Sequence, residues 1–350
     1  MNKRSFTGIL LGLFAMATAA HVHAQAGPAT AQKAAAAAPE PGDDYPRPPK
    51  PAKPYTIGVV LPHLSNPHFV GQAYGYIDEA QKLGARVTLL EAGGYQYLDR
   101  QISQIEDLIA SKVDLIILVA TSGAGTVGAV EHAVAAGIPL INCNVMTASD
   151  KIVARIRSDD LVIGQMQAEF MGRALSGKGN VVMLRGAPGT TWAEDRGNSF
   201  KKLLAEKFPG VKVLGEQYSQ STPAEGLKLM EDFMQTYPQI DGVYNGADTT
   251  AIGASQAVLA AGKKGRITIT TTDFQADTEK FMREGVLSAA VVQQTVVIGR
   301  WGMRAAINHL EKRKVPANLW TPLLLVSKDN LGAVDMRGVR APEGWKPPAR

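Results

Sequence analysis

The sequence predicts an α/β protein with two doubly wound parallel-sheet lobes joined by a multi-strand hinge. From Tyr55 onward, short apolar runs alternate with amphipathic stretches, which is the pattern of repeated strand–helix units in a parallel sheet covered on both faces. The same rhythm restarts in the second half of the 350-residue chain, and two sheets of similar size suit that length better than one very wide sheet. The right-handed crossover rule then makes each sheet a doubly wound lobe.

The first half contains the helix whose ends are clearest. Asn66 suits the N-cap, Pro67 the first helical position and Gly84 the stop signal. Continuous apolar runs in this half predict buried strands, and stretches with amphipathic spacing predict helices. The strands are expected at 55–61, 85–91, 113–120 and 139–145, and the helices at 67–84, 97–112 and 126–137.

The second half repeats this order of elements. Strands are expected at 179–185, 211–217, 241–246, 266–273 and 287–294, and helices at 162–178, about 192–207, 223–238, 249–265, 275–285 and 297–313. The N-terminal lobe is expected to comprise 55–158 plus 295–325, and the C-terminal lobe 159–294 plus 326–350. Hinge strands are expected near Ser158–Asp160, Gln294–Val296 and Leu325–Ser327.

The N-terminal residues predict export to the periplasm. Two basic residues precede an apolar stretch from Phe6 to about Ala20, and a small-x-small site follows, which is typical of a cleaved secretory signal peptide at 1–24. An uncleaved membrane helix is the alternative, but the apolar stretch is shorter than the roughly 20 residues that a span needs. Residues 25–54 are rich in Ala and Pro and are expected to form a linker outside the fold.

Charge and cysteine content exclude several classes. The net charge is +5 without a Lys or Arg block, so nucleic acid binding is not expected. The only cysteine, Cys143, lies in an apolar run and is interpreted as a buried small hydrophobe, with a reactive thiol as the alternative. One thiol cannot form an internal disulfide, so stability must come from the core. A monomer is expected.

One enzyme motif occurs, at Gly123–Gly128, where "GAGTVG" is a literal G-x-G-x-x-G between a strand and a helix. It follows the third strand rather than the first, and the next strand ends without the acid that binds a ribose in dinucleotide sites. These glycines are therefore expected to serve close helix packing and a tight turn. Metal-binding signatures and a G-x-S-x-G elbow are absent from the sequence, so neither catalysis, a cofactor nor a metal is expected.

Ligands of doubly wound sheets bind beyond the carboxyl ends of the strands, and two lobes can face each other there across a cleft. The side chains that follow the predicted strands are nearly all planar hydrogen-bonding groups or aromatic rings. Such groups suit a small polyhydroxylated or polar ligand, because amides, carboxylates and guanidinium groups bind hydroxyls and rings stack on apolar faces. The candidate ligand-binding residues are Asn66, His68, Phe69, Tyr95, Asn144, Trp192, Arg196, Ser221, Asp248, Asp273 and Gln293.

Most of these residues also have a structural interpretation. The alternatives are a helix N-cap for Asn66, Asp248 and Asp273, an ion pair within its own helix for Arg196, the core for Phe69 and Trp192, a brace of the Gly93–Gly94 turn for Tyr95, and the surface for His68. The acids Glu194 and Asp195 are expected to serve the start of their helix.

Four segments carry a family resemblance: "SNPHFVGQAYGYIDEAQKLGARV", "GTTWAEDRGNSF", "NGADTTAIGASQAV" and "AAVVQQTVVIG". They resemble type I periplasmic solute-binding proteins of the ribose-binding and Lac-repressor effector-domain superfamily, over about Tyr55–Val334. The resemblance implies the two-lobed fold of that family, and a ligand held between the lobes. Carried over residue by residue, it implicates Asn66, His68, Phe69, Asn144, Arg196, Asp273 and Gln293.

The chain departs from the ribose-binding pattern at three positions. Val145 stands where that pattern has an arginine, Ser221 where it has an aromatic residue, and Ala247 where it has an asparagine. These departures argue against ribose itself. The resemblance implies an exported solute-binding protein that captures a sugar or polyol for an ABC-type importer, with a membrane permease as its partner.

A second function stays open. "LLEAGGYQYLDRQISQIEDLI" resembles TorT-like periplasmic sensors, which detect trimethylamine N-oxide for a histidine kinase. Tyr95 matches a tyrosine of that site, whereas Phe69 and Asp160 stand where tryptophans would complete a cation cage. The alternative is therefore a sensor that presents its liganded state to a kinase.

Overall fold

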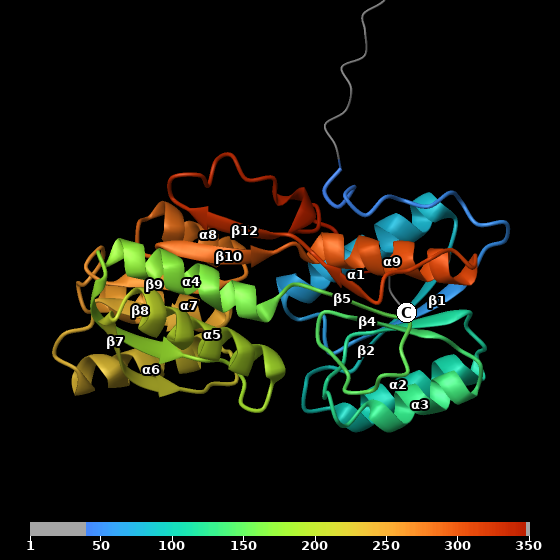
Figure 1. The fold of residues 1–350 in the computed structure, drawn as a ribbon, viewed down its shortest axis with the longest axis horizontal. Helices are drawn as coiled ribbons and strands as arrows, with labels where there is room; N and C mark the ends of the chain where they lie inside the picture. The colour runs from blue at the N-terminus through green and yellow to red at the C-terminus, as the bar shows by residue number, and fades with distance from the viewer. Residues whose placement is uncertain (1–39, 348–350) are drawn as a thin grey trace, which may run out of the picture. The chain divides into compact units, whose positions relative to one another are not determined.

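The computed structural model describes residues 40–347, so the predicted signal peptide at 1–24 lies outside the described residues. The described chain forms two six-stranded sheets, each with helices on both faces (Figure 1). The predicted fold class is therefore confirmed. Within this range, no helix combines the length and the apolar character needed to cross a membrane.

The first sheet has the strand order β11-β5-β4-β3-β1-β2 and is parallel throughout. Its strands are β1 (Thr56–Leu61), β2 (Arg86–Glu91), β3 (Leu115–Leu118), β4 (Leu140–Cys143), β5 (Ala154–Arg157) and β11 (Asn318–Trp320). Its helices are α1 (Pro67–Leu83), α2 (Leu98–Ala110), α3 (Val127–Ala135) and α9 (Thr295–Leu310). The strand order reverses between β1 and β3, which is the topological switch point of this lobe.

The second sheet has the equivalent order β12-β10-β9-β8-β6-β7, in which only β12 runs antiparallel. Its strands are β6 (Lys178–Leu184), β7 (Gly210–Gln217), β8 (Gly242–Asn245), β9 (Thr268–Thr272), β10 (Ala289–Gln293) and β12 (Leu323–Ser327). Its helices are α4 (Asp160–Ala174), α5 (Thr191–Lys207), α6 (Pro223–Thr236), α7 (Asp248–Ala260) and α8 (Ala276–Arg283), and a short 3₁₀ helix follows at Met336–Gly338.

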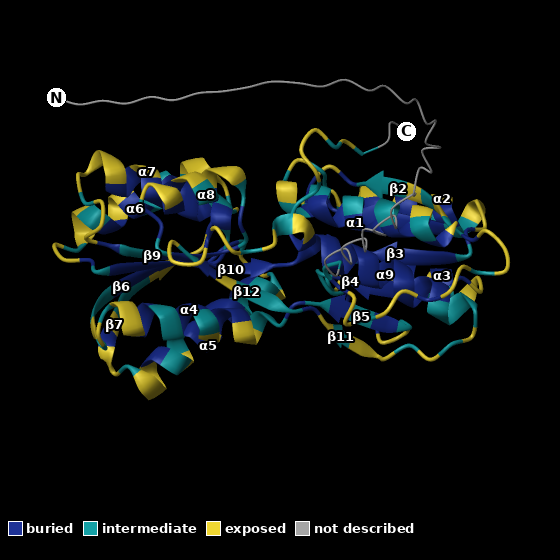
Figure 2. Ribbon diagram, turned by 90° about the horizontal axis from the view of Figure 1, so that it is seen from above, coloured by how far each residue is buried: buried dark blue, intermediate teal, exposed yellow. Residues whose placement is uncertain are grey.

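The central strands are buried on both faces, as their continuous apolar runs predict (Figure 2). In β3, Leu115 and Ile117 join the core beneath α1 and α9, whereas Ile116 and Leu118 join the core beneath α2 and α3. Successive side chains of a strand point to opposite faces, so one four-residue run supplies two cores. Cys143 is also fully buried, and burial raises the pKa of its thiol to about 12, which confirms the prediction of a small core residue.

All the predicted helices and strands are present, and the ends of α1 are as expected. Asn66 accepts a hydrogen bond from the His68 backbone N–H at 2.8 Å, and Gly84 ends the helix with a φ of 74°. Strands β5 and β11 were not expected, and β12 was expected only as a hinge strand near Leu325–Ser327. They are short strands at or near the ends of the sheets, and β5 alternates buried and half-buried residues in place of a continuous apolar run.

Three passages of the chain connect strands of the two sheets. The passages follow β5 at Ser158, β10 at Gln294, and β11 at Thr321. The first and third are joined directly, because the Ser158 and Thr321 hydroxyls lie 3.0 Å apart.

The boundary expected at 325/326 falls inside β12, because β12 pairs with β10 from Leu323 onward. After β12 the chain returns to the first lobe, where Trp345 packs against Tyr74 of α1 at a centroid distance of 5.4 Å, so the assignment of all of 326–350 to the C-terminal lobe is wrong at its end.

The interpretation of 25–54 as a linker outside the fold is wrong for its described part near Gly42 and Tyr45. The Trp301 indole N–H donates to Gly42 O at 2.7 Å, and the fully buried Arg304 guanidinium donates to Gly42 O and Tyr45 O. Arg304 is also paired with the fully buried Glu79. The composition of this segment did not predict its packing, because the segment is polar and Pro-rich and has no apolar periodicity. It is held by buried side chains of α1 and α9.

Candidate functional site

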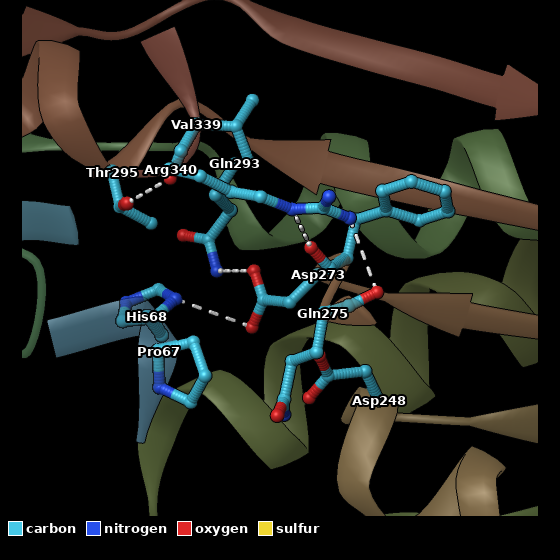
Figure 3. A pocket seen from close by; sticks show the side chains of 10 residues that line it. Pro67, His68, Asp248, Asp273, Gln275, Gln293, Thr295, Val339 and Arg340 are labelled. Atoms are coloured by element: carbon cyan, nitrogen blue, oxygen red, sulfur yellow. Dashed lines mark hydrogen bonds and ion pairs between the residues drawn. The ribbon is translucent and has the colours of Figure 1, made fainter. Parts of the chain in front are cut away.

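Asp273 lies at the centre of the site, directly after β9. Its backbone has a φ of 70°, and its carboxylate Oδ1 accepts a hydrogen bond from Gln293 Nε2 at 3.0 Å. The other oxygen, Oδ2, lies 3.4 Å from His68 Nδ1 (Figure 3). Three candidate residues therefore meet, from the ends of β9 and β10 and from the first turn of α1. Asp273 is not an N-cap, because α8 begins after Gln275.

His68 is not on the surface, because its side chain is only 10% exposed. Asn144 Nδ2 lies 2.6 Å from His68 Nε2 and also donates to Gln72 Oε1 at 3.2 Å. Gln72 in turn donates to the Tyr76 hydroxyl at 2.8 Å. With Asn144 donating to Nε2, the ring N–H of a neutral imidazole is on Nδ1, which lies 3.4 Å from Asp273 Oδ2 and makes no hydrogen bond with a described residue.

The charge environment of Asp273 favours its ionised form. Burial raises the pKa of this carboxyl, but His68, Arg196 and the hydrogen bond from Gln293 together lower it below its ordinary value. The polar chain from Gln72 through Asn144 and His68 thus ends at a carboxylate. These groups can donate to and accept from hydroxyl groups of a ligand.

Arg196 is 5% exposed and lies on α5. Its Nε donates to Asp160 Oδ1 at 2.7 Å, and its Nη1 donates to Gly246 O at 3.0 Å. The alternative of an ion pair within its own helix is wrong, because Asp160 is the first residue of α4. Burial lowers the pKa of Arg196, but the charges of Asp160 and Asp273 outweigh burial and raise it, so Arg196 and Asp273 act on each other. Trp192 flanks this guanidinium, which lies 5.0 Å from the ring centroid.

Aromatic rings line the part of the candidate site that the first lobe contributes. Phe69 is 4% exposed and makes edge contacts with His68 and Tyr95, at centroid distances of 5.0 and 6.4 Å. Burial raises the pKa of the Tyr95 hydroxyl. The charge of Arg196 lowers this pKa and the charge of Asp273 raises it, so Tyr95 lies within electrostatic range of both groups. His63 packs on both Phe69 and Tyr95.

Asp248 is the first residue of α7 and is 3% exposed. It does not cap the helix, because Ala247 occupies the N-cap. Its Oδ2 has no hydrogen-bond partner among residues 40–347. Burial, followed by the negative charge of Asp273, raises the pKa of this carboxyl to about 7.

Some candidates are not brought into this cluster. The Asn66 side chain is used in capping α1, which was its structural alternative. Ser221 has a φ of 61°, and its buried Oγ has no hydrogen-bond partner in the described part of the chain. Glu194 does more than favour the helix start, because it pairs with Arg185 at 3.1 Å and accepts from the Tyr218 hydroxyl at 2.7 Å.

Sequence reasoning missed Gln72, Asp160 and His63 as parts of the site. His63 follows β1 and carried the same positional signal as the other candidates. Asp160 was noted only as the replacement of a tryptophan. Gln72 lies one turn after His68 on the same helix face, so helical spacing could have found it.

The glycines of the 123–128 motif are only partly explained by packing. A Cβ at Gly125 would lie close to Leu98, whereas no described atom lies within 4 Å of a Cβ at Gly128.

A small cavity adjoins Asp273 and has a volume of about 20 Å³. Its lining comes from both lobes and from the C-terminal segment: Pro67, His68, Asp248, Asp273, Phe274, Gln275, Gln293, Thr295, Val339 and Arg340 (Figure 3). Among residues 40–347, no group of three His, Cys, Asp or Glu side chains could hold a metal ion.

Comparisons with known proteins agree with this architecture. A family model described as a periplasmic binding protein domain matches residues 57–314. The ribose import binding protein of Bacillus subtilis (strain 168) is 31% identical over 273 residues, which cover 78% of this chain and 87% of the relative. The D-apiose import binding protein of Actinobacillus succinogenes is 30% identical over 247 residues, which cover 70% of this chain and 77% of the relative.

A solved structure gives the same result. An ABC transporter solute-binding protein from Bradyrhizobium sp. BTAi1, with bound Bis-Tris, superposes with a TM-score of 0.78 at 27% identity, and the match covers 86% of this chain and 90% of that one. The family match extends from β1 to just beyond α9 and includes five of the six strands of each sheet, leaving out β11 and β12. The chain therefore belongs to the periplasmic binding protein family, a family of solute-binding proteins and not of enzymes.

Proposed function

We propose that this protein is exported by a signal peptide at 1–24 and captures a sugar or polyol between its two lobes for an ABC-type importer. The observation that carries the proposal is the meeting of His68 from α1 with Asp273 and Gln293 from the second sheet. Carboxylate, amide and imidazole groups bind hydroxyls in fixed directions, and Phe69 and Tyr95 offer rings for the apolar face of a sugar. Relatives named for the import of ribose and D-apiose support this ligand class.

Ligand entry requires the lobes to part. A cavity of about 20 Å³ holds no more than about one water molecule, whereas sites for small molecules occupy roughly 300–1,000 Å³. The ligand would enter between His68 and Asp273 and then contact both lobes. Its contacts with both lobes favour the closed state, which is a hinge-bending population shift. We place the hinge at Ser158, Gln294 and Thr321, with one lobe built on each sheet, and the closed form as the one that a membrane permease recognises.

The ligand is a sugar or polyol other than ribose. Val145, Ser221 and Ala247 lack the polar or aromatic groups of the ribose-binding pattern. Signalling to a histidine kinase, as in TorT-like sensors, stays a prediction for the same site.

A thermal-shift screen of pentoses, hexoses, their polyols and methylated amines tests the proposal. A tight ligand stabilises the folded protein by mass action, by about 2.7 kcal/mol at a hundredfold excess over its Kd. We expect a sugar or polyol to raise the Tm of the wild type and of Asp232→Asn, an exposed control on α6, but not of Arg196→Ala or Asp273→Ala. Gln293→Ala provides a milder variant if either of these fails to fold.

Three results would count against the proposal. The first is that no sugar or polyol raises the Tm. The second is that a methylated amine alone does so, which would favour the sensor. The third is that the best compound keeps its full shift in folded Arg196→Ala, Asp273→Ala and Gln293→Ala, which would place the site elsewhere.

A further inference from the structure

Asp248 differs from the other charged groups of the site in lacking a counter-ion. Arg196 is paired with Asp160, and Arg340, which also lines the cavity, is paired with Glu279 at 2.7 Å. Asp273 has Gln293 and His68 as partners. Asp248 Oδ2 has none among the described residues, although the residue is only 3% exposed. The Gln275 side chain and the Thr249 backbone N–H act as neutral donors that lower the pKa of this carboxyl, but neither supplies a positive charge.

The charged groups facing Asp248 do not compensate it. Asp273, from the loop after β9, is a second negative charge that raises the pKa of Asp248, and the His68 imidazole, from α1, lowers it. The Arg340 guanidinium, from the C-terminal segment, is turned to Phe274 O, Gln275 O and Glu279. An uncompensated carboxylate in a buried position is costly, and a bound proton or a bound cation relieves this cost.

We infer that the ligand carries a protonated amine beside its hydroxyl groups, and that Asp248 is the residue that selects this amine. The inference rests on the proposed function, since it takes the polyhydroxylated ligand class as given. It predicts an amino sugar or an amino polyol as the preferred solute. The geometry that supports it is the unpartnered Oδ2 of Asp248 lining the same cavity as Asp273 and His68 (Figure 3).

A neutral hydroxyl is a weaker partner for this site. It can donate one hydrogen bond to Asp248, but whenever Asp248 is ionised it leaves two neighbouring negative charges in place. An ammonium group donates a charge-assisted hydrogen bond and also offsets the repulsion between Asp248 and Asp273. Because a difference of tenfold in Kd is easily measured, the two ligand classes can be separated by direct titration.

The experiment compares matched pairs on the full mature chain by calorimetric titration. The pairs are D-glucosamine with D-glucose, D-galactosamine with D-galactose, D-mannosamine with D-mannose, and 1-amino-1-deoxysorbitol with sorbitol. We expect the amine of at least one pair to bind about tenfold or more tightly than its neutral partner. In Asp248→Asn this preference should fall to about one, while Asp232→Asn should keep it.

A pH series on the wild type supplies a second readout that needs no variant. The ionised fraction of a carboxyl with a pKa of about 7 rises about fivefold between pH 6 and pH 7. The affinity for the amine should rise by about this factor over that interval, and the affinity for its neutral partner should change much less.

The outcomes separate this inference from the proposed function. Equal or tighter binding of the neutral partners overturns the inference and leaves the proposed function standing. If the preference for amines persists in Asp248→Asn, or if the affinity for the amine does not rise with pH, Asp248 is not the residue that selects the amine. If neither these compounds nor the sugars and polyols of the thermal screen bind, both proposals are overturned.

Discussion

His68 Nδ1 lies 3.4 Å from Asp273 Oδ2, so a residue of the first lobe contacts the central carboxylate of the second. The contact is supported from both sides, because Asn144 holds the far nitrogen of the imidazole and Gln293 holds the other carboxylate oxygen. In the absence of a solute, this pair links the two lobes across the site.

We predict that His68→Ala shifts the ligand-free protein toward an open form. Removal of the imidazole deletes the interlobe contact to Asp273 and lowers the free energy needed to part the lobes. The radius of gyration of the ligand-free protein, measured by small-angle X-ray scattering, should increase. His132→Ala is the matched control, since the His132 side chain is 58% exposed and pairs only within its own lobe with Glu106. An unchanged radius in His68→Ala would show that this contact does not hold the lobes together.

Asp248 makes the stability of the ligand-free protein depend on pH. Its folded pKa, about 7, lies above the ordinary value of an aspartate, so the native state retains a proton that the unfolded state has released. The free energy of unfolding therefore decreases as the pH rises from about 4 to about 7, and the upper limit of this loss is about 4 kcal/mol. Asp248→Asn cannot ionise and should be more stable than the wild type at pH 8.

Thermal unfolding of Asp248→Asn and the wild type at pH 5 and pH 8 checks this prediction. The difference in Tm should be more than twice as large at pH 8 as at pH 5, because only about 1.6 of the roughly 4 kcal/mol is lost by pH 5, while Asp232→Asn should follow the wild type at both. The same Tm difference at both pH values would mean that Asp248 is not protonated in the native state near neutral pH.

The sequence predicted the positions of the site residues better than their partners. Post-strand position singled out Asp248, Asp273 and Gln293, because the carboxyl ends of parallel strands lie on one edge of a sheet. It could not show that Asp248 lacks a counter-ion, because burial and pairing depend on which loops meet. The caps of α1 were predictable, since Asn66 and Gly84 act on backbone groups within one turn.

The N-terminal segment shows the opposite case. Its Ala- and Pro-rich composition predicted a linker, and nothing local indicated that the carbonyls of Gly42 and Tyr45 would meet Arg304. The partners are provided by α9, from the far end of the chain. Similarly, β11 is too short to give a periodic signal, and its register with β5 is set by tertiary structure.

We predict that Arg304→Met strongly destabilises the protein. It leaves Glu79 buried with Arg47 as its remaining cation. It also removes one donor from Tyr45 O and one from Gly42 O, which keeps the Trp301 indole N–H. Breaking a buried pair in this way costs about 3–5 kcal/mol, and the remaining Arg47 should hold the loss to about 2–4 kcal/mol. Arg173→Met is the matched control, because its helical pair with Glu169 is exposed and should contribute less than about 1 kcal/mol. Urea unfolding measures both; similar losses for the two variants would contradict a structural role for the N-terminal segment.

The last prediction concerns Gly246, whose carbonyl accepts the Nη1 hydrogen bond of Arg196. A Cβ at this position would lie 1.9 Å from Arg185 O, a backbone atom that cannot turn aside. Gly246→Ala must therefore move the end of β8 away from Arg185 and carry the carbonyl out of line with Arg196. We expect an overpacking cost of about 1–3 kcal/mol in unfolding free energy.

The affinity of Gly246→Ala for the best compound of the thermal screen should fall about tenfold, because a small displacement of a fixed guanidinium weakens directional hydrogen bonds to hydroxyls. Gly128→Ala is the control: Gly128 lies in α3, and no described atom lies within 4 Å of the added carbon, so the variant should gain about 0.5–1 kcal/mol in stability and bind normally. Calorimetric titration of the two variants separates a displaced Arg196 from a general effect of alanine. Wild-type affinity in folded Gly246→Ala would mean that Arg196 binds the ligand without this anchor, or does not bind it.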